Sequence, residues 1–426
     1  MRYTVIQLNY YLATLFVVIT LSIAQGQSAE DTMLVDDYGE DLFSQYPFLD
    51  ETRNELIMTG NTGLNGFFSK LQSLEGSQSS KVHIMHIGDS HIQADFFSGK
   101  VRTLFKEDIR FPMHERGFVF PYRLAKTNNP LNYQVRYTGQ WEGKKCVSSK
   151  HYSQWGVSGI SAVTTSSTSS FTINPNRTEN DYDIKKLKVF YPVADSSSFQ
   201  AKVLLDSGNQ LINYIVADGY MEFEFLKPQQ AITITLAKKS PKQQQFILQG
   251  IWLESENPSV TYSATGVNGA EVPSYFRCQD FNKQLAQLNP DLIVISLGTN
   301  DAFKAQFDAA QFRADYRKLI ANIRKYLPEV DILLTTAGDS YRRRRPNKYM
   351  EVAADEVIAL AKEMHVVVWD FYRVMGGLKS IKEWREQGLC AKDLLHFSQK
   401  GYEIQGELFF QALDVAYEEY CNGAGK

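Results

Sequence analysis

Four short apolar runs constrain the fold of this chain more than any other feature of its sequence. They lie at residues 82–87, 291–297, 331–335 and 365–369. Runs that are almost continuously apolar are typical of strands buried on both faces of a parallel sheet. Between the later runs, apolar residues recur with helical spacing, as in Phe312, Tyr316 and Ile320, which indicates helices with one apolar side. The sequence therefore predicts an α/β domain whose parallel sheet is flanked by helices.

The middle of the chain has a different pattern. From about residue 145 to 258, Ser and Thr are frequent and apolar residues alternate with polar ones, as in 221–225. Alternation broken by turns is typical of an antiparallel β-sandwich. Because α/β elements resume near residue 260, we expect a sandwich at 145–258 to interrupt the α/β domain. The two parts of that domain are then expected at 81–144 and 259–426.

The N-terminus has the composition of an export signal. Arg2 precedes an apolar run at 12–24, which is too short to span a bilayer comfortably, and small residues follow it. We expect residues 1–26 to be a signal peptide, with a membrane anchor as the alternative. Residues 27–80 are polar and acidic with one amphipathic piece at 64–74, and we expect them to form a peripheral arm. The mature protein is then expected in the periplasm or outside the cell, without stable membrane insertion.

Charge and cysteine content narrow the function further. The formal net charge of −3 gives no electrostatic support for binding nucleic acid. In an exported chain the four cysteines allow three disulfide connectivities: they are Cys146, Cys278, Cys390 and Cys421. The sequence leaves two possibilities open, a Cys390–Cys421 disulfide or four free thiols. No trio of His, Asp or Glu has convincing metal-ligand spacing, so we expect chemistry without a metal or cofactor. The oligomeric state is not indicated.

A Gly-Asp-Ser tripeptide ends the first apolar run, at Gly88, Asp89 and Ser90. A serine at this point presents its hydroxyl at the carboxyl edge of the sheet, where open α/β sheets bind ligands. Its own N–H lies at the positive end of the next helix, which suits a developing oxyanion. The alternative is a tight turn with a serine that caps the helix.

Two further motifs lie at the ends of predicted elements. Asn300, in the Gly-Thr-Asn-Asp sequence after the second run, can donate its side-chain amide to an oxyanion; the alternative is a simple turn. Asp393 and His396 precede the last helix, and their spacing lets the carboxylate orient the imidazole as in hydrolase triads. The alternative for this pair is an acid and a histidine on a surface loop.

The three motifs, in this order, resemble blocks I, III and V of the SGNH (GDSL-like) hydrolase superfamily. The resemblance implies an SGNH-type parallel sheet flanked by helices. It assigns Ser90 as nucleophile, His396 as general base and then acid, Asp393 as the group that orients His396, and Asn300 as an oxyanion donor. Within the superfamily the chain resembles bacterial peptidoglycan O-acetylesterases, which carry a carbohydrate-module-like β-sandwich inserted between blocks I and II.

Two glycines fit the block II pattern of the superfamily, Gly159 and Gly269. Gly269 precedes Asn300 by 31 residues, enough for one helix and one strand, whereas Gly159 precedes it by 141 residues with the whole sandwich between. Neighbouring parallel strands need only a short crossover. We therefore expect the N–H of Gly269, with the N–H of Ser90 and the amide of Asn300, to form the oxyanion hole.

These expectations combine into an exported serine esterase that removes O-acyl groups from a carbohydrate such as peptidoglycan through an acyl-serine intermediate. The resemblance implies that the acyl groups are acetyl groups. The expected partner is an O-acylated glycan. One alternative is a polysaccharide O-acetyltransferase, in which a sugar hydroxyl replaces water. The other is a non-catalytic glycan-binding protein in which the sandwich binds the sugar. The sequence does not indicate which glycan or acyl group is involved.

Overall fold

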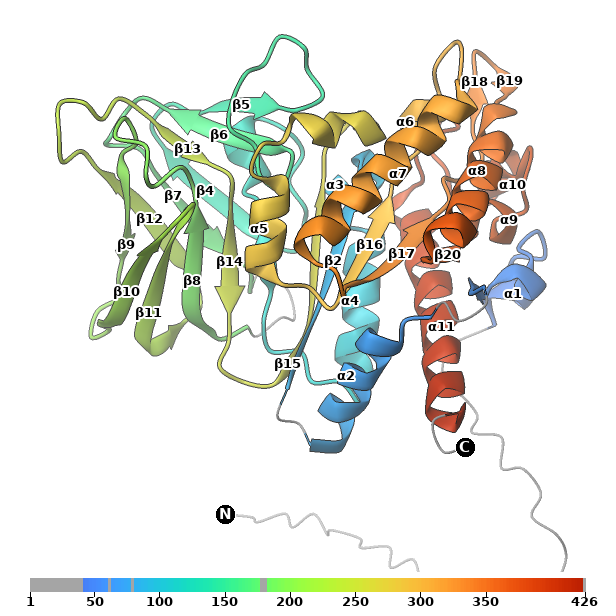
Figure 1. Ribbon diagram of the computed structural model, residues 1–426, viewed down its shortest axis with the longest axis horizontal. Helices are drawn as coiled ribbons and strands as arrows, with labels where there is room; N and C mark the ends of the chain where they lie inside the picture. The colour runs from blue at the N-terminus through green and yellow to red at the C-terminus, as the bar shows by residue number, and fades with distance from the viewer. Residues whose placement is uncertain (1–40, 60–62, 78–79, 177–181, 424–426) are drawn as a thin grey trace, which may run out of the picture. The chain divides into compact units, whose positions relative to one another are not determined.

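The apolar runs form the central sheet of the protein. The computed structural model describes residues 41–59, 63–77, 80–176 and 182–423, and its largest sheet has the strand order β1-β20-β17-β16-β2-β15 (Figure 1). The five strands from β20 to β15 are parallel, and the short β1 pairs antiparallel with β20. Their bounds are β1 Leu56–Ile57, β2 Lys81–Gly88, β15 Ser259–Gly266, β16 Leu292–Ser296, β17 Asp331–Thr335 and β20 Val367–Trp369.

Alternate residues of β2 pack into two different cores. Met85 and Ile87 belong to the core that includes residues of α5, α7 and α8, whereas Val82 and Ile84 belong to the core that includes residues of α2, α4 and α11. Helices therefore cover both faces of the sheet, which is why its strands are apolar throughout. The helix bounds are α2 Asn65–Ser77, α4 Phe97–Glu107, α5 Phe281–Leu288, α7 Ala309–Tyr326, α8 Tyr349–Met364 and α11 Gln399–Gly423.

Short elements connect these layers. The helical ones are α1 Leu42–Gln45, η1 Glu51–Arg53, α3 Ser90–Gln93, η2 Tyr122–Ala125, η3 Val272–Arg277, α6 Thr299–Ala302, α9 Phe371–Val374 and α10 Ser380–Glu386. The hairpin strands β18 Tyr341–Arg342 and β19 Arg345–Pro346 pair with each other. Of these, α3 and α6 each begin within three residues of the carboxyl end of a parallel strand.

The described part of the predicted N-terminal arm is packed into the α/β layers. Phe67, Phe68 and Leu71 of α2 are fully buried, and the N–H of Phe67 donates to the Asp331 carboxylate at the start of β17 (2.8 Å). Together with β1 at the sheet edge, α2 makes this segment an integral part of the α/β layers.

The antiparallel strands form three further sheets, with the orders β10-β11-β8-β14-β3, β4-β7-β12-β9 and β13-β6-β5. Their bounds are β3 Gly117–Val119, β4 Gln134–Thr138, β5 Glu142–Lys145, β6 Ile160–Thr164, β7 Ser170–Asn174, β8 Ile184–Phe190, β9 Gln200–Leu204, β10 Leu211–Ala217, β11 Tyr220–Gln229, β12 Ile232–Ala237, β13 Phe246–Leu248 and β14 Gly250–Glu254. These sheets lie in sequence between β2 and β15 of the parallel sheet. The predicted class is thus confirmed: a helix-flanked parallel sheet with inserted antiparallel sheets.

The antiparallel pairing begins before the predicted start of the sandwich. β3, β4 and β5 all precede or reach residue 145, and β3 pairs with β14. The backbone N–H of Phe118 in β3 also donates to Ser263 Oγ in β15 (2.9 Å). The bounds 145–258 stay a prediction for the domain, while the strands that form its sheets span 117–254.

The cysteines are all free thiols, so the Cys390–Cys421 pair considered from the sequence is wrong. Cys390 is buried, and its Sγ lies 3.5 Å from the backbone carbonyl of His396. Cys421, on α11, is within 3.8 Å of the amide of Gln72 on α2. The two thiols therefore have different neighbours, and no disulfide ties α11 to the loop that carries His396.

The predicted signal peptide, 1–26, lies outside the described residues. Within the described ranges, no helix is long and apolar enough to cross a membrane.

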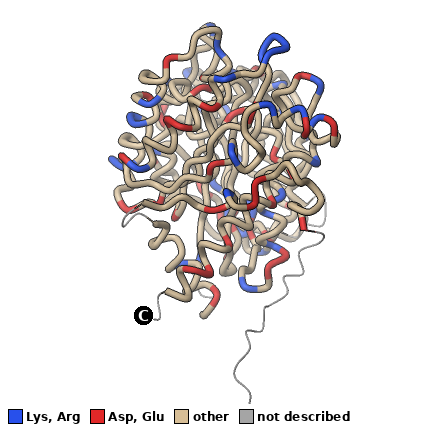
Figure 2. The backbone as a smooth tube through the Cα atoms, turned by 90° about the vertical axis from the view of Figure 1, so that its right-hand side faces the viewer, with Lys and Arg blue, Asp and Glu red and all other residues tan. Residues whose placement is uncertain are grey.

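Acidic and basic residues are interspersed along the backbone in the view of Figure 2. The described chain from Leu42 onward forms one compact unit.

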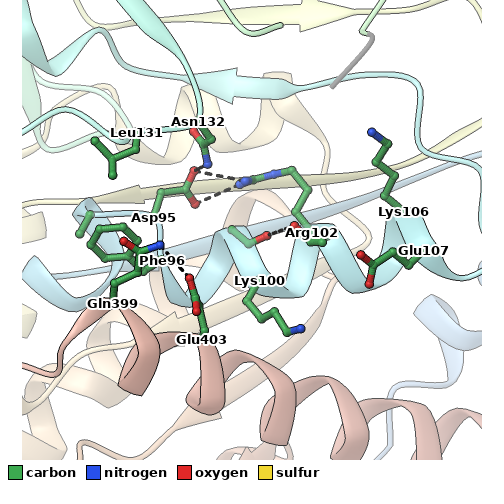
Figure 3. A pocket seen from close by; sticks show the side chains of 13 residues that line it. Asp95, Phe96, Lys100, Arg102, Lys106, Glu107, Leu131, Asn132, Gln399 and Glu403 are labelled. Carbon is green, nitrogen blue, oxygen red and sulfur yellow. Dashed lines mark hydrogen bonds and ion pairs between the residues drawn. The ribbon is translucent and has the colours of Figure 1, made fainter. Parts of the chain in front are cut away.

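A buried ion network connects the start of α4 to β15. The Asp95 carboxylate accepts from Arg102 at 3.1 and 3.2 Å (Figure 3). It also accepts from Arg116 at 2.8 Å. Arg102 also donates from Nε to the carbonyl of Tyr262 in β15 (3.0 Å). Burial opposes ionisation of Asp95, but the two guanidinium groups outweigh it and lower its pKa to about 2.

We expect Asp95→Asn to lower the free energy of unfolding at pH 7 by about 3–5 kcal/mol, because it leaves buried guanidinium groups without a counter-charge. The pKa of Asp95 is depressed in the folded state, so its contribution is present above the unfolded pKa, about 3.9, and is lost as pH falls toward about 2. Urea unfolding at several pH values measures both effects. The matched control is Asp218→Asn, because the Asp218 side chain is 80% exposed in its ion pair with Lys283. This substitution should lower the free energy of unfolding by at most about 1 kcal/mol.

Candidate active site

Three strand ends meet at one edge of the parallel sheet. Gly88, the last residue of β2, is in register with Gly266 at the end of β15 and with Ser296 at the end of β16. The segments after these strands contain three of the predicted site residues: Ser90 after β2, Gly269 after β15 and Asn300 after β16. The parallel register thus brings together residues separated by up to 210 positions in sequence.

The turn after β2 leaves no space for a side chain at Gly88. A Cβ atom there would lie 2.3 Å from Ile92 Cγ1 and 2.8 Å from the carbonyl oxygen of Ser296. The Gly88 carbonyl accepts from the Tyr275 hydroxyl (2.7 Å). Glycine is therefore required for close packing against β16 and α3, and this packing holds Ser90 at the sheet edge.

Ser90 begins the short helix α3, and Asp89 caps it. One Asp89 carboxylate oxygen accepts from the backbone N–H of His91 (2.9 Å), and the other accepts from the Asn300 amide (3.1 Å). Asp89 is only 1% exposed. Burial raises the pKa of Asp89 to about 6, although the hydrogen bond from the His91 N–H favours its ionised form.

The side chains of Ser90, His396 and Asp393 form a continuous hydrogen-bonded chain. Ser90 Oγ lies 3.1 Å from His396 Nε2, and His396 Nδ1 lies 2.8 Å from Asp393 Oδ2. The other Asp393 oxygen accepts from the backbone N–H groups of Leu395 and His396, both at 3.1 Å. Burial opposes ionisation of Asp393, but these hydrogen bonds outweigh it and lower its pKa. This order of groups can activate a serine hydroxyl for attack on a carbonyl.

The amide of Asn300 has two acceptors in this structure. Its Nδ2 donates to Asp89 at 3.1 Å and to the carbonyl of Ala270 at 3.0 Å. A side-chain amide carries only two protons, so both are engaged. Asn300 thus holds the turn after β15 against the turn after β2, a structural contribution that the sequence motif alone did not indicate.

The two candidate glycines have different surroundings. Gly269 is exposed, has a φ of +84°, and has open space where a Cβ would lie. It precedes Ala270, whose carbonyl contacts Asn300. Gly159 is buried against Cys146, and its N–H donates to the carbonyl of Gly156 (3.1 Å). The N–H of Gly159 is thus already engaged, whereas Gly269 lies in the turn that adjoins Asn300.

His91 and Tyr402 are neighbours of the site that the motifs did not reveal. The His91 ring stacks on the His396 ring, with centroids 5.3 Å apart and an interplanar angle of 24°. The Tyr402 hydroxyl lies 3.0 Å from His91 Nδ1. Burial, with the nearby His396 charge, lowers the pKa of His91 to about 3. His91 is therefore neutral near pH 7. In the sequence, only its position next to Ser90 indicated that it would lie near the site.

The described residues contain no cluster of three or more His, Cys, Asp or Glu side chains arranged to hold a metal ion. The groups brought together at this site are instead a hydroxyl, an imidazole, a carboxylate and several N–H donors. This set suits acyl transfer through a serine.

Part of the chain matches a known protein family. Residues 249–404 match the model of the GDSL-like Lipase/Acylhydrolase family. The matched segment contains Gly269, Asn300, Asp393 and His396. Ser90 lies outside it, before the antiparallel strands in sequence. The resemblance to SGNH hydrolases is confirmed. No curated protein matches the sequence.

Solved structures extend the similarity beyond that segment. A structure described as a peptidoglycan O-acetylesterase in action is 26% identical, covers 85% of this chain and 99% of its own, and superposes with a TM-score of 0.71. A lipase/acylhydrolase from Enterococcus faecalis also matches, with 24% identity, coverage of 36% of this chain and 75% of its own, and a TM-score of 0.30. A mutant acetylxylan esterase from Geobacillus stearothermophilus matches with 20% identity, coverage of 36% of this chain and 72% of its own, and a TM-score of 0.30. The family match and the first structure support a carboxylic ester hydrolase.

We expect Asn300→Asp to destabilise the protein more at pH 8 than at pH 5. The new carboxylate would face Asp89 and the Ala270 carbonyl, and two close acids must share a proton. Their folded pKa values would be raised, as that of Asp89 already is, so the stability that depends on the shared proton is lost as pH rises. Thermal unfolding at both pH values measures this difference. Asn257→Asp, at an exposed turn, should show none; equal deficits at both pH values for Asn300→Asp would contradict the prediction.

Proposed function

We propose that this protein is an exported carbohydrate O-acetylesterase that acts on an O-acetylated glycan, with peptidoglycan as the favoured substrate. The observation that carries the proposal is the 3.1 Å contact of Ser90 Oγ with His396 Nε2, continued to Asp393. The substrate class is supported by the solved peptidoglycan O-acetylesterase, which is similar over most of both chains. Export is supported by the apolar N-terminal run in the sequence.

The first step is attack of Ser90 Oγ on the ester carbonyl while His396 Nε2 takes the hydroxyl proton. Asp393 holds the other ring nitrogen and stabilises the imidazolium. The tetrahedral intermediate collapses when His396 returns the proton to the sugar oxygen, which leaves as a free hydroxyl. Water, deprotonated by His396, then attacks the acetyl-serine and releases acetate. The side chains of His396 and Asp393 are 39% and 50% exposed, so water can reach this base.

The oxyanion is held by the backbone N–H groups of Ser90 and Gly269 together with the Asn300 amide. Because both amide protons of Asn300 have acceptors, one contact must open when the oxyanion forms. Hydrogen bonds to charged acceptors are the stronger ones. The contact with the neutral Ala270 carbonyl is therefore the one that yields, and the contact with Asp89 keeps the amide in place.

His91 is a positioning residue in this proposal. Its ring lies against His396 while Tyr402 fixes its own orientation. A low pKa keeps His91 uncharged, so it supports the ring of the base without repelling the imidazolium that forms during the reaction.

Replacing the nucleophile tests the proposal. We expect Ser90→Ala to lower kcat for acetate release from O-acetylated peptidoglycan by about 10³-fold or more, because the acyl-serine cannot form. The measurement is acetate release by the folded variant, compared with Ser207→Ala at an exposed turn, which should retain full activity. Near-normal release by Ser90→Ala would contradict the mechanism, and acetate release that depends on an added sugar acceptor would favour a transferase.

Substitution of His91 separates positioning from folding. We expect His91→Ala to lower kcat by up to about tenfold with little change in KM, as for loss of one aromatic stacking contact. His91→Phe keeps a ring against His396 and should recover most of kcat. Steady-state kinetics on one acetyl ester give both constants. Equal losses for Ala and Phe at matched Tm would contradict a role for the stacked ring.

A further inference from the structure

A groove runs along α4. Its volume is about 580 Å³, within the range of ligand pockets. We call it the α4 groove. It is lined by Ala94, Asp95, Phe96, Gly99, Lys100, Arg102, Thr103, Lys106, Glu107, Leu131, Asn132, Gln399 and Glu403 (Figure 3). Its floor is α4; the loop before β4 and the first turns of α11 lie on either side of it.

The α4 groove begins next to the candidate active site. Gln399 is the third residue after His396. The ring of Phe96 stacks on Tyr402, with centroids 6.3 Å apart and an interplanar angle of 22°, and the hydroxyl of Tyr402 contacts His91. One tyrosine ring therefore lies between this end of the groove and the histidine that packs on His396.

The floor of the groove is held rigid by the buried ion network described above. Asp95 and Arg102 line the groove, and the amide nitrogen of Asn132 donates to Asp95 at 2.8 Å. Asn132 precedes β4, so the loop before the antiparallel sheet is tied to α4 through this bond. Sites whose walls are fixed before binding lose less conformational entropy when a ligand binds.

The lining has balanced charge and many neutral polar groups. Three acidic side chains accompany three basic ones, with the amides of Asn132 and Gln399 between them. A phosphate polymer would need an excess of positive charge, and an acyl chain would need a mostly apolar wall. Here the large apolar side chains are only Phe96 and Leu131. Mixed donors and acceptors around a few apolar faces suit the hydroxyls and ring carbons of sugars.

The groove is also long enough for more than one sugar ring. Its residues on α4 extend from Gly99 to Glu107, roughly 12 Å at the usual rise per residue. A polymer whose acetylated sugar is at Ser90 must continue across the protein surface away from the site. The α4 groove offers a polar channel for the part of the polymer that leaves past Phe96 and Gln399.

We propose that the α4 groove is a glycan subsite that binds the sugars next to the acetylated one. The inference rests on the proposed function, since it assumes a polymeric carbohydrate substrate. The proposal assigns recognition of the glycan polymer to residues of the α/β layers and of the loop at Leu131 and Asn132. Any contribution of the antiparallel sheets would come in addition.

Gly99→Gln tests the subsite without loss of the fold. A Cβ at Gly99 would lie 3.5 Å from Asn132 Nδ2, an ordinary contact, and glutamine is a better helix former than glycine. The longer side chain would occupy the groove. The measurement is the ratio of kcat/KM for O-acetylated peptidoglycan to kcat/KM for 4-nitrophenyl acetate, which is too small to need the subsite. We expect this ratio to fall about tenfold, through KM, as for loss of roughly 1.4 kcal/mol of binding free energy.

Gly76→Gln is the matched control. It makes the same substitution at an exposed position of α2 where a Cβ would meet nothing within 4 Å, and it should keep the wild-type ratio. Equal ratios for the two variants would overturn the subsite. If the wild type released no acetate from either ester in a Ser90-dependent way, the proposed function would fail instead.

A binding measurement tests the subsite independently of turnover. Calorimetry with a soluble, deacetylated peptidoglycan glycan fragment should give a Kd about tenfold weaker for Gly99→Gln than for Gly76→Gln. Equal affinities for the two variants would reject the subsite, whatever the catalytic result.

Discussion

The buried carboxylate of Asp89 connects the ends of two neighbouring strands, and the candidate site depends on that connection. It accepts from the N–H of His91 in α3, after β2, and from the amide of Asn300 in α6, after β16. A carboxylate removed from water without partners would be strongly unfavourable. Donors from both turns offset that cost, although the pKa of Asp89 is still raised to about 6. The positions of Ser90 and Asn300 are therefore linked through one group.

The parallel sheet and the cluster of motif residues could be predicted from sequence because both follow from local patterns. Apolar runs predict buried parallel strands, and the carboxyl ends of such strands meet at one edge. A motif at each strand end therefore places its residues together without knowledge of the helices between. Asp393 and His396 needed only their i, i+3 spacing. The Ser90–His396 contact, across 306 positions, followed from the family resemblance rather than from spacing.

Other features could not be predicted because they depend on packing between distant segments. The polar composition of 27–80, with one amphipathic piece at 64–74, indicated a peripheral arm, yet Phe67 and Phe68 of α2 are fully buried in the core. β3 has only three residues, too few for alternation to be recognised, so the start of the antiparallel pairing before residue 145 was not visible. The stacking of His91 on His396 and the α4 groove likewise arise where α3, α4 and α11 meet. No local pattern in any one of these helices encodes that meeting.

The two sides of the candidate site are held by different means, and this difference suits the proposed chemistry. Ser90 follows a turn fixed by close backbone packing at Gly88 and by the buried Asp89. His396 instead lies on an exposed loop in which Leu394 has a φ of +52°, a left-handed conformation that is uncommon for this residue type.

The Asp393 carboxylate stabilises that loop through the backbone N–H groups of Leu395 and His396 while it also holds the imidazole. One side chain thus holds both the loop and the imidazole of His396. Ser90, the proposed nucleophile, is positioned by the closely packed turn before it, whereas His396, the proposed base, is held by local hydrogen bonds and the stacked ring of His91. This arrangement leaves the His396 side chain 39% exposed, which suits the water-activating step of the proposed esterase mechanism.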